Sequence, residues 1–277
     1  MASSERAART GGQSASRMRR LRRALQCAAA MAYACLLLAC ASSGPPVGPT
    51  LPIAPAVVAS EQHTVALLGA TGMVGDFLLR ESLARGYSVR ALARSPAKLA
   101  QFSDRITIVE GDARDPAVID ELLRGSDVVI SAVGPVQADG AANLFINTIV
   151  TGNVLHAMTA QDISRYLVIS GAGVVLPSDQ RDFLGWWIRT LAQVGLADAL
   201  EDKQAEYKLL ANSSADWTLV RCPLIDAESF RAPALVSVLT PPAFRVRAGE
   251  VARFTIDQIT ASNYSRQGPF LGSGAAP

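Results

Sequence analysis

The stretch that decides the fold runs from Thr64 to Gly75 and reads TVALLGATGMVG. Its first five residues form a short apolar run, which predicts a buried strand that ends at Gly69. Glycines then recur at every third position, and an amphipathic segment to about Arg85 predicts a helix. A strand, a glycine-rich turn and a helix in this order are typical of the first unit of a dinucleotide-binding fold.

Each glycine of this turn has its own physical task. Gly69 allows a tight turn off the strand, Gly72 lets backbone N–H groups approach a pyrophosphate, and Gly75 lets the helix pack closely on the sheet. The start of the helix presents free N–H groups and the positive end of its dipole to an anion. We therefore expect the pyrophosphate to be cradled by Gly69, Thr71, Gly72, Met73, Val74 and Gly75.

The second predicted strand, from Ser88 to Ala93, ends beside a basic residue. Sites specific for NAD usually place Asp or Glu here, where it accepts hydrogen bonds from the ribose hydroxyls. This chain has Arg94 instead, with Lys98 one turn later, and a guanidinium suits a 2′-phosphate. The sequence therefore favours NADP over NAD, with a merely solvated Arg94 as the alternative.

Further apolar runs alternate with helical patterns along the rest of the chain. Strands are expected at 106–109, 127–132, 166–170 and 216–221, and helices starting at Ser95-Pro96, starting at Asp115-Pro116 and over 141–161. This alternation predicts an α/β fold of the Rossmann type, doubly wound around a mostly parallel sheet, with a small substrate-facing subregion from about Leu224.

Ligands of such sheets bind at the carboxyl ends of the strands. We therefore expect further cofactor contacts from residues that follow the third and fourth strands, namely Asp112, Ala113, Ala132, Val133 and Gly134.

Composition and charge exclude several classes of protein. Hydrophobic residues make up 49% and charged residues 18% of the chain, which indicates a folded domain. Seven arginines and one glutamate lie before residue 24, and the remainder carries 19 basic and 23 acidic residues, so nothing indicates binding to nucleic acid. The four cysteines and two histidines have no metal-ligand spacing, so no metal site is expected. Cys222 is expected to be an inert core thiol, and His156 a residue on the face of a helix.

Residues 1–40 have the layout of a secretory signal. An arginine-rich stretch precedes 16 apolar residues at 24–39, which is short of the roughly 20 that a spanning helix needs. Leu37-Leu38-Ala39-Cys40 resembles a bacterial lipobox, in which the cysteine is lipidated; an uncleaved Ala/Leu signal anchor is the alternative. Residues 41–61 are expected to be a flexible tether to a domain at 62–277.

The expected location is therefore the bacterial cell envelope, as a membrane-anchored lipoprotein that faces the periplasm. The alternative is the cytoplasmic face of the membrane, with the leader kept as an uncleaved tether.

The run from Val65 to Lys98 resembles the short-chain dehydrogenase/reductase superfamily. It is most similar to the atypical branch that includes NmrA-like regulators and biliverdin and flavin reductases. The resemblance continues through 131–134, 168–170 and 216–221 and spans about 215 residues. It implies a Rossmann-type fold with a nicotinamide cofactor.

Catalytic members of the wider superfamily combine a strand-five serine with a downstream Tyr-x-x-x-Lys, whose tyrosine is the general acid. Ser170 fits the first position, but no Tyr-x-x-x-Lys follows, since Tyr207 and Lys208 are adjacent and would diverge on a helix. Lys203 lies near a position where this branch often has a basic or polar residue beside the nicotinamide. Ser170 and Lys203 are therefore the candidate catalytic residues, although Lys203 also fits a solvated helix lysine.

The resemblance implies an NADP(H)-binding oxidoreductase that transfers hydride to a small acceptor of the flavin or quinone kind. The missing tyrosine also fits a non-catalytic redox sensor or assembly factor that acts through a protein partner, and less well an isomerase with tightly held cofactor. The family builds its substrate lid after the fifth strand, where apolar residues recur at near-helical spacing. These residues are Leu184, Trp187, Ile188, Leu191 and Val194. Packing against the domain is favoured for the segment over a flat aromatic-substrate site or a membrane contact through Trp186-Trp187.

Overall fold

The structure is a computed structural model that describes residues 63–135, 140, 144–261 and 263–274. The expected signal, the lipobox with Cys40 and the tether lie outside the described residues. Within the described ranges, no helix is both long enough and apolar enough to cross a membrane.

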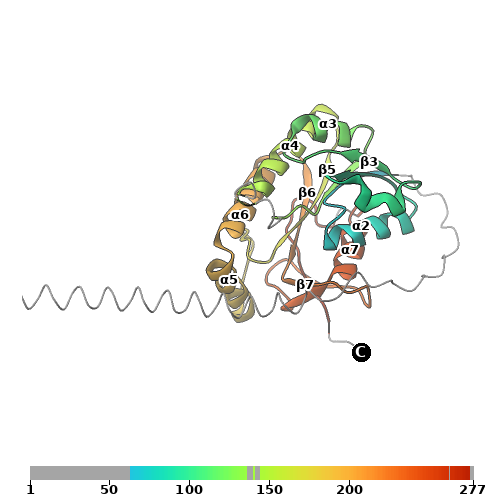
Figure 1. The fold of residues 1–277 in the computed structure, drawn as a ribbon. Coiled ribbons are helices and arrows are strands. Elements are labelled where there is room, and N and C mark those ends of the chain that lie inside the picture. Colours follow the sequence, from blue (N-terminus) through green and yellow to red (C-terminus); the bar gives the residue numbers. More distant parts are fainter. Residues whose placement is uncertain (1–62, 136–139, 141–143, 262, 275–277) are drawn as a thin grey trace, which may run out of the picture. The chain divides into compact units, whose positions relative to one another are not determined.

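An eight-stranded sheet forms the centre of the fold, with strand order β3-β2-β1-β4-β5-β6-β10-β8 (Figure 1). Neighbouring strands pair in parallel except for β8, which runs antiparallel to β10. This confirms the predicted doubly wound, mostly parallel sheet. The strands are β1 (Thr64–Leu68), β2 (Ser88–Ala93), β3 (Thr107–Glu110), β4 (Val128–Ser131), β5 (Arg165–Gly171), β6 (Asp216–Cys222), β8 (Leu235–Ser237) and β10 (Phe270–Gly272).

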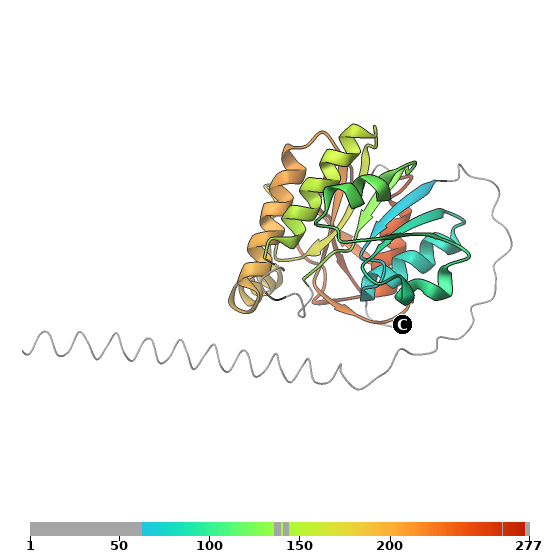
Figure 2. The ribbon, with the colours of Figure 1, turned by 45° about the horizontal axis from the view of Figure 1, so that its top comes forward.

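Helices cover both faces of the sheet (Figures 1 and 2). Strand β1 shows why, because Val65 and Leu67 pack into one apolar cluster while Ala66 and Leu68 pack into the other. Alternate side chains of a strand point to opposite faces, so a strand that is apolar throughout requires a cover on both sides. The first cluster lies under α2 (Met73–Ala84) and α7 (Ala248–Asp257), and the second under α3 (Pro116–Leu123), α4 (Ile146–Ala160) and α6 (Ala197–Asn212).

The strand order changes direction between β1 and β4. The chain moves from β1 outward to β2 and β3, then returns to place β4 on the other side of β1. The connections leave the carboxyl ends of β1 and β4 in opposite directions, which opens a crevice between them. A small parallel pair, β7 (Leu224–Asp226) and β9 (Arg245–Arg247), belongs to the C-terminal subregion.

Of the two helix starts expected at a capping residue followed by Pro, the one at Asp115 is confirmed and the one at Ser95 is not. The segment after Ser95 forms a 3₁₀ helix, η1 (Pro96–Phe102), and the Ser95 side chain makes no capping hydrogen bond. Asp115 does cap α3, since its carboxylate accepts a hydrogen bond of 2.9 Å from the backbone N–H of Ala117. Both segments carry Pro at the first position, so the side-chain cap is what differs between them.

The helix expected over 141–161 begins later, at Ile146. Phe145 has a left-handed backbone with a φ of 57°, which prevents the helix from extending toward the N-terminus. The carboxylate of Asp202 on α6 accepts hydrogen bonds of 2.9 Å from the backbone N–H groups of Asn147 and Thr148. The cap of α4 therefore comes from a residue far away in the sequence.

The segment after β5 forms helix α5 (Phe183–Gly195), as its spacing predicts. The expected packing against the domain is wrong for three of its residues, because Trp186 is 53% exposed, Trp187 40% and Leu191 59%. Leu184 and Ile188 are half-buried, so the inner face of α5 runs through them and the three exposed residues point outward. The side chain of Val194 lies outside the described residues.

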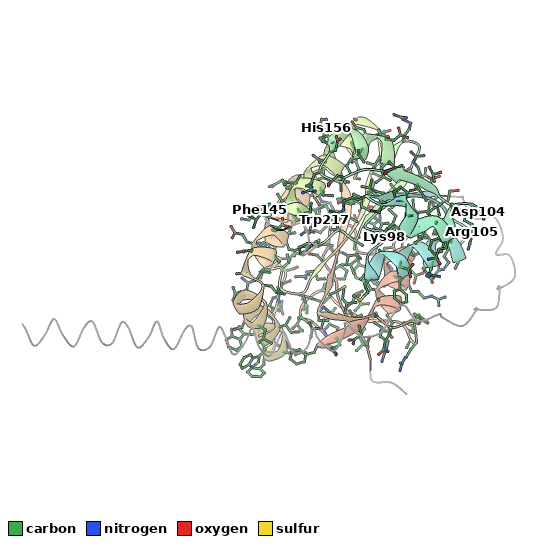
Figure 3. All side chains as sticks on the ribbon, viewed as in Figure 1. Lys98, Asp104, Arg105, Phe145, His156 and Trp217 are labelled. Atoms are coloured by element: carbon green, nitrogen blue, oxygen red, sulfur yellow. The ribbon has the colours of Figure 1, made fainter. Side chains whose placement is uncertain are left out.

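Two smaller expectations concern isolated residues. His156 is exposed on α4 (Figure 3). Cys222 is buried at the end of β6, and burial raises the pKa of its thiol to about 12. Both residues are placed as the sequence predicts, and at neutral pH the thiol of Cys222 is inert.

Candidate functional site

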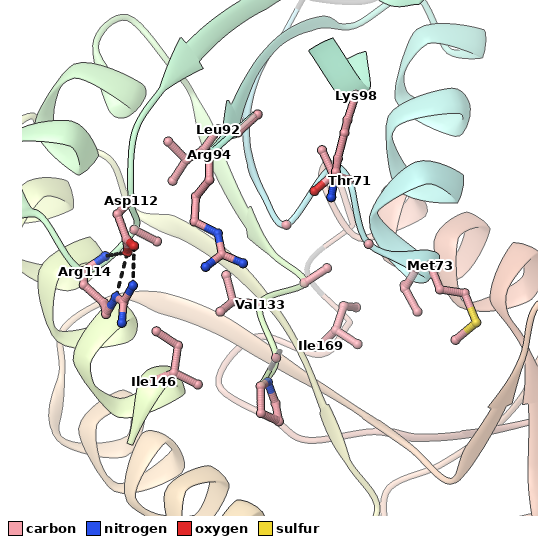
Figure 4. A pocket seen from close by; sticks show the side chains of 18 of the residues that line it. Thr71, Met73, Leu92, Arg94, Lys98, Asp112, Arg114, Val133, Ile146 and Ile169 are labelled. Atoms are coloured by element: carbon pink, nitrogen blue, oxygen red, sulfur yellow. Dashed lines mark hydrogen bonds and ion pairs between the residues drawn. The ribbon is translucent and has the colours of Figure 1, made fainter. Parts of the chain in front are cut away.

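A cleft of about 660 Å³ opens at the carboxyl edge of the sheet, between the ends of β1 and β4 (Figure 4). It lies at the point where the strand order reverses, which is where open α/β sheets bind ligands. All but one of the expected cofactor and catalytic residues of the domain line it, and Gly75 is the exception. The lining residues that the sequence singled out are Gly69, Thr71, Gly72, Met73, Val74, Arg94, Asp112, Ala113, Ala132, Val133, Gly134, Ser170 and Lys203.

The glycine turn forms one wall of the cleft. Gly69 has a φ of +79°, and a Cβ there would lie 2.6 Å from the carbonyl oxygen of Ala132. Gly75 lies behind the turn, where a Cβ would come within 1.9 Å of the Gly69 oxygen, so it packs α2 onto the turn. Helix α2 starts after Gly72 with no side-chain cap, which leaves its first N–H groups to a ligand. This wall has the form of an anion cradle at a helix N-terminus.

Basic side chains lie at the ends of β2 and β3. Arg94 and Lys98 are exposed and line the cleft, and Figure 4 shows Arg94 extending into it. Arg114, which sequence reasoning missed, lines the cleft beside Asp112. Its Nε and backbone N–H each donate a hydrogen bond of 2.9 Å to one Asp112 oxygen. The sequence signal that could have identified Arg114 is its position two residues after Asp112, an acidic residue already assigned to the cleft.

The Asp112 carboxylate is strongly held as the anion. The side-chain hydrogen bond from Arg114 lowers the pKa of Asp112 to about 2, and the charge of Arg94 acts in the same direction. Because Arg114 occupies this carboxylate, the group adds little uncompensated negative charge to the cleft. The end of the cleft formed by β2 and β3 therefore suits an anionic group.

Ser170 and Lys203 both line the cleft, and Lys203 is hydrogen-bonded to the residue that precedes Ser170. Ser170 is the penultimate residue of β5 and is only 5% exposed, and its Oγ finds no hydrogen-bond partner in the part of the chain that the structure describes. Lys203 reaches from α6 and donates a hydrogen bond of 3.1 Å to the carbonyl oxygen of Ile169. Burying a hydroxyl without a hydrogen-bond partner costs free energy, which indicates that an atom of a bound ligand forms the missing hydrogen bond.

Behind Lys203 lies a buried chain of hydrogen bonds that the sequence did not indicate. The carboxylate of Glu206 accepts from the Lys203 ammonium at 3.0 Å and from the Thr151 hydroxyl at 3.1 Å. Thr151 in turn lies 3.2 Å from the hydroxyl of Tyr166. Burial raises the pKa of Glu206, opposed by the charge of Lys203. Lys203 is thus a held, half-buried residue, and its reading as a solvated helix lysine is wrong.

Apolar side chains complete the inner part of the cleft. Ile146 comes from the start of α4, Ile169 from β5 and Ile225 from β7. The C-terminal subregion therefore contributes directly to the lining, through Ile225. Such a mixture of apolar walls and a few convergent polar groups is typical of small-molecule sites.

The loop after Ser170 is fixed by a buried ion-pair cluster. Arg221 on β6 is fully buried and its Nη1 lies 2.8 Å from Asp179, which also pairs with Arg181 at 3.0 Å. Arg181 donates to the carbonyl oxygens of Ala172 and Val174 in the same loop. Burial lowers the pKa of Arg221 to about 10, against the opposing effect of Asp179. The cluster holds the backbone that follows Ser170.

In the described part of the chain, no group of three or more His, Cys, Asp or Glu residues is arranged to hold a metal ion. No tyrosine is among the described residues that line the cleft.

Comparison with curated proteins finds plant reductases. The chain is 28% identical to cinnamoyl-CoA reductase 1 of Petunia hybrida over 128 residues, which covers 43% of this chain and 38% of that protein. It is 25% identical to dihydroflavonol 4-reductase of Arabidopsis thaliana over 217 residues, which covers 66% of this chain and 55% of that protein. The matches thus span about half or less of the length of these relatives.

Solved structures share the fold. An anaerobillin reductase from Escherichia coli O157:H7 superimposes with a TM-score of 0.65 at 20% identity, over 77% of this chain and 98% of that one. A short-chain dehydrogenase/reductase from Veillonella parvula, solved in complex with NADP, gives a TM-score of 0.63 at 15% identity, over 77% and 95%. A family model described as NAD(P)H-binding matches residues 69–262, which includes the glycine turn and the cleft. The chain therefore belongs to this NAD(P)H-binding family.

Proposed function

We propose that this protein is an NADPH-dependent reductase that transfers hydride to a small, flat acceptor of the flavin or quinone kind. The observation that carries the proposal is the arrangement of the cleft. A glycine turn and a basic end belong to its lining, and so do the buried Ser170 and Lys203, which is bonded to the carbonyl oxygen of Ile169. The names of the matched curated relatives, which are reductases, support the same class of reaction.

The preference for NADPH rests on the basic end of the cleft. Arg94 and Lys98 follow β2, where an NAD-specific site would carry an acidic residue. Asp112 lies close by, but its carboxylate is held by Arg114. Cationic side chains at this position favour a 2′-phosphate over a free ribose hydroxyl.

The chain's own residues bind the cofactor and position the acceptor. Bound NADPH supplies the hydride. The α2 start holds the pyrophosphate, and the buried Oγ of Ser170 donates a hydrogen bond to a polar atom of the acceptor. Lys203 provides a charge and a proton beside that atom, because its ammonium faces the cleft and is anchored by Glu206. Ile146, Ile169 and Ile225 exclude water from an apolar acceptor.

One observation favours a second candidate function. No tyrosine lines the described part of the cleft, so the general acid of the wider superfamily is absent there. A non-catalytic redox sensor or assembly factor would bind the cofactor and turn over no acceptor. Such a sensor would also distinguish the oxidised from the reduced cofactor.

The experiment that tests the proposal is a calorimetric titration of the purified chain with NADPH and NADH, followed by an assay of NADPH consumption with a flavin and a quinone. We expect NADPH to bind more tightly, and Arg94→Ala to remove about 1.5–3 kcal/mol of that binding without changing NADH. Arg124→Ala, which alters an exposed arginine at the end of α3, is the matched control. Equal affinity for both cofactors refutes the NADPH preference, and tight binding without turnover favours the sensor.

We also propose that the leader tethers the domain to the membrane of a bacterial cell envelope through a lipid on Cys40, facing the periplasm. The lipobox-like sequence and the apolar run before it support this. Fractionation of cells that express the chain, followed by mass determination of its mature N-terminus, tests it. Cys40→Ser is expected to abolish the lipid. A mature chain that retains residues 1–39 would instead indicate an uncleaved anchor.

A further inference from the structure

Helix α5 exposes a continuous apolar face. Phe183 is 75% exposed, Trp186 53%, Trp187 40% and Leu191 59%. These residues stand at positions i, i+3, i+4 and i+8, which places them on one side of the helix. Together they form what we call the α5 face. Large exposed apolar patches on a folded domain mark a surface that another phase or molecule covers.

The three aromatic rings of the α5 face pack against one another. Phe183 and Trp186 are stacked with centroids 6.4 Å apart, and Trp187 meets Phe183 and Trp186 edge-on at 6.0 and 5.2 Å. Rings in such contact restrict one another's rotamers, so the face is preformed. It needs little ordering when it is covered.

The opposite side of α5 is attached to the domain by polar contacts. Arg189 donates a hydrogen bond of 2.9 Å to the carbonyl oxygen of Gly173. At the N-terminus, the Asp182 carboxylate accepts from the Gly185 N–H at 2.8 Å and from the Thr240 hydroxyl at 2.7 Å. These contacts fix the direction in which the α5 face points. Because the other side of α5 already contacts the domain, the α5 face is the outer side of a docked helix and not the domain-facing side of a detached one.

The residues of and around the α5 face are low in charge, as contact with an apolar environment requires. Helix α5 contains no acidic residue, and its one charged side chain, Arg189, is the one attached to Gly173. Leu239, which is 41% exposed, adjoins the start of the helix, since its carbonyl oxygen accepts from the N–H of Gln180 at 3.0 Å. The apolar area therefore extends onto the C-terminal subregion.

We propose that the α5 face inserts into the interfacial region of a lipid bilayer. Tryptophan is the side chain that most favours this region, because its ring is apolar and its N–H remains hydrogen-bonded. The chain itself supplies the second argument. Whether the anchor is a lipid on Cys40 or the uncleaved apolar run at 24–39, it is separated from the domain by the segment 41–62, which spans at most about 75–80 Å when extended. That reach exceeds the diameter of about 45 Å expected for a domain of this size, so an anchored chain can present α5 to the bilayer.

The inference depends on the expected leader but not on the proposed reductase activity. Anchoring keeps the domain at a high effective concentration near the lipid, so a modest apolar face is enough to hold it there. A second copy of the chain could also cover the face, and the experiment below separates that case.

The positions of the tryptophans make the test direct. The chain has three, and Trp217 is buried at 3% exposure, so Trp186 and Trp187 are the two that a lipid can reach. The full chain is bound to phosphatidylcholine vesicles with and without bromine on the acyl chains, and tryptophan emission is recorded on vesicles recovered by flotation. We expect the brominated lipid to quench emission toward the level of Trp217 alone.

Variants define what the quenching reports. In a chain with both Trp186→Phe and Trp187→Phe, only Trp217 emits, and brominated lipid should not change its emission. Quenching of Trp217 would mean that the domain unfolds on the lipid, and it would overturn the proposal. Phe183→Ser with Leu191→Ser should reduce quenching while leaving the reporters in place. Ile149→Ser, which alters an exposed residue of α4, is the matched control and should leave quenching unchanged.

Three results overturn the proposal. One is emission that is identical on plain and brominated vesicles although the chain floats with them, because the α5 face then stays in water. Another is a chain that does not float with vesicles at all. The last is a doubled mass by light scattering that the Phe183→Ser and Leu191→Ser variant abolishes, since the face would then join two copies of the chain.

Discussion

The ammonium of Lys203 lies 3.0 Å from the carboxylate of Glu206, and the Glu206 side chain is 2% exposed whereas that of Lys203 is 15% exposed. The pair thus has one partner inside the protein and one at the wall of the cleft. The buried Glu206 carboxylate cannot replace its bond to Lys203 with a bond to water. It therefore fixes the position of the Lys203 ammonium at the wall of the cleft.

Glu206→Gln is expected to lower both stability and turnover. The glutamine keeps the volume but loses the charge, so the free energy of unfolding should fall by about 1–3 kcal/mol. If Lys203 donates a proton, the pH profile of NADPH consumption should also shift, because Lys203 loses its anion. Glu201→Gln, on the exposed side of the same helix, is the control. An unchanged pH profile at reduced stability would assign Glu206 a structural role alone.

Ser170→Ala is expected to separate function from stability. The Ser170 hydroxyl is buried and has no partner among the described residues, so its removal should leave the free energy of unfolding unchanged or raise it by about 1 kcal/mol. Acceptor reduction should slow, because the proposed hydrogen bond to the acceptor is lost. Ser131→Ala offers the contrast: this buried hydroxyl bonds Tyr166, and its removal should cost about 1 kcal/mol. Equal activity of Ser170→Ala and the native chain would remove Ser170 from the site.

Asp179→Ala is expected to be strongly destabilising. It leaves the fully buried guanidinium of Arg221 without its carboxylate, at a cost of about 3–5 kcal/mol. Asp226→Ala removes an acid whose partner, Arg245, is 52% exposed, and should cost no more than about 1 kcal/mol. Chemical denaturation of both variants measures the difference. Similar losses would show that burial does not set the strength of the Arg221 pair.

Asp112→Asn is expected to change the acid end of the stability curve. Arg114 lowers the pKa of Asp112 from 3.8 to about 2, so the folded state binds this proton more weakly than the unfolded state. The resulting stabilisation is complete above pH 3.8 and disappears as the pH falls toward 2. Because the side chain is 35% exposed, solvent screening limits the effect to about 1 kcal/mol.

Denaturant titrations of the native chain and of Asp112→Asn at several pH values test this. The two curves should differ at neutral pH and converge near pH 2. Asp120→Asn, an exposed acid on α3, is the control. A difference that persists at the lowest pH would point to a change in loop geometry in place of a lost ion pair.

Local pattern and chain direction were enough to predict six of the eight strands of the sheet and most of the residues that line the cleft, whereas the short strands β8 and β10 were not predicted. The residues of the cleft follow strands, and in a parallel sheet all carboxyl ends lie at one edge. Positions such as Gly69, Arg94, Asp112 and Val133 could therefore be assigned to one site without any contact being known. The tasks of Gly69 and Gly75 follow in the same way, since a turn that approaches a helix and a neighbouring strand has no room for a Cβ.

Contacts between distant residues were decided by the tertiary structure alone. Asp202 and Glu206 look like solvated acids of an amphipathic helix, yet α6 packs against α4, and they become a helix cap and the buried partner of Lys203. The outward direction of Trp187 had the same origin, because apolar spacing identifies a helix but does not say which side another element will cover. Burial of a polar group depends on what lies opposite it, and that is a property of the packed chain and not of any local stretch of sequence.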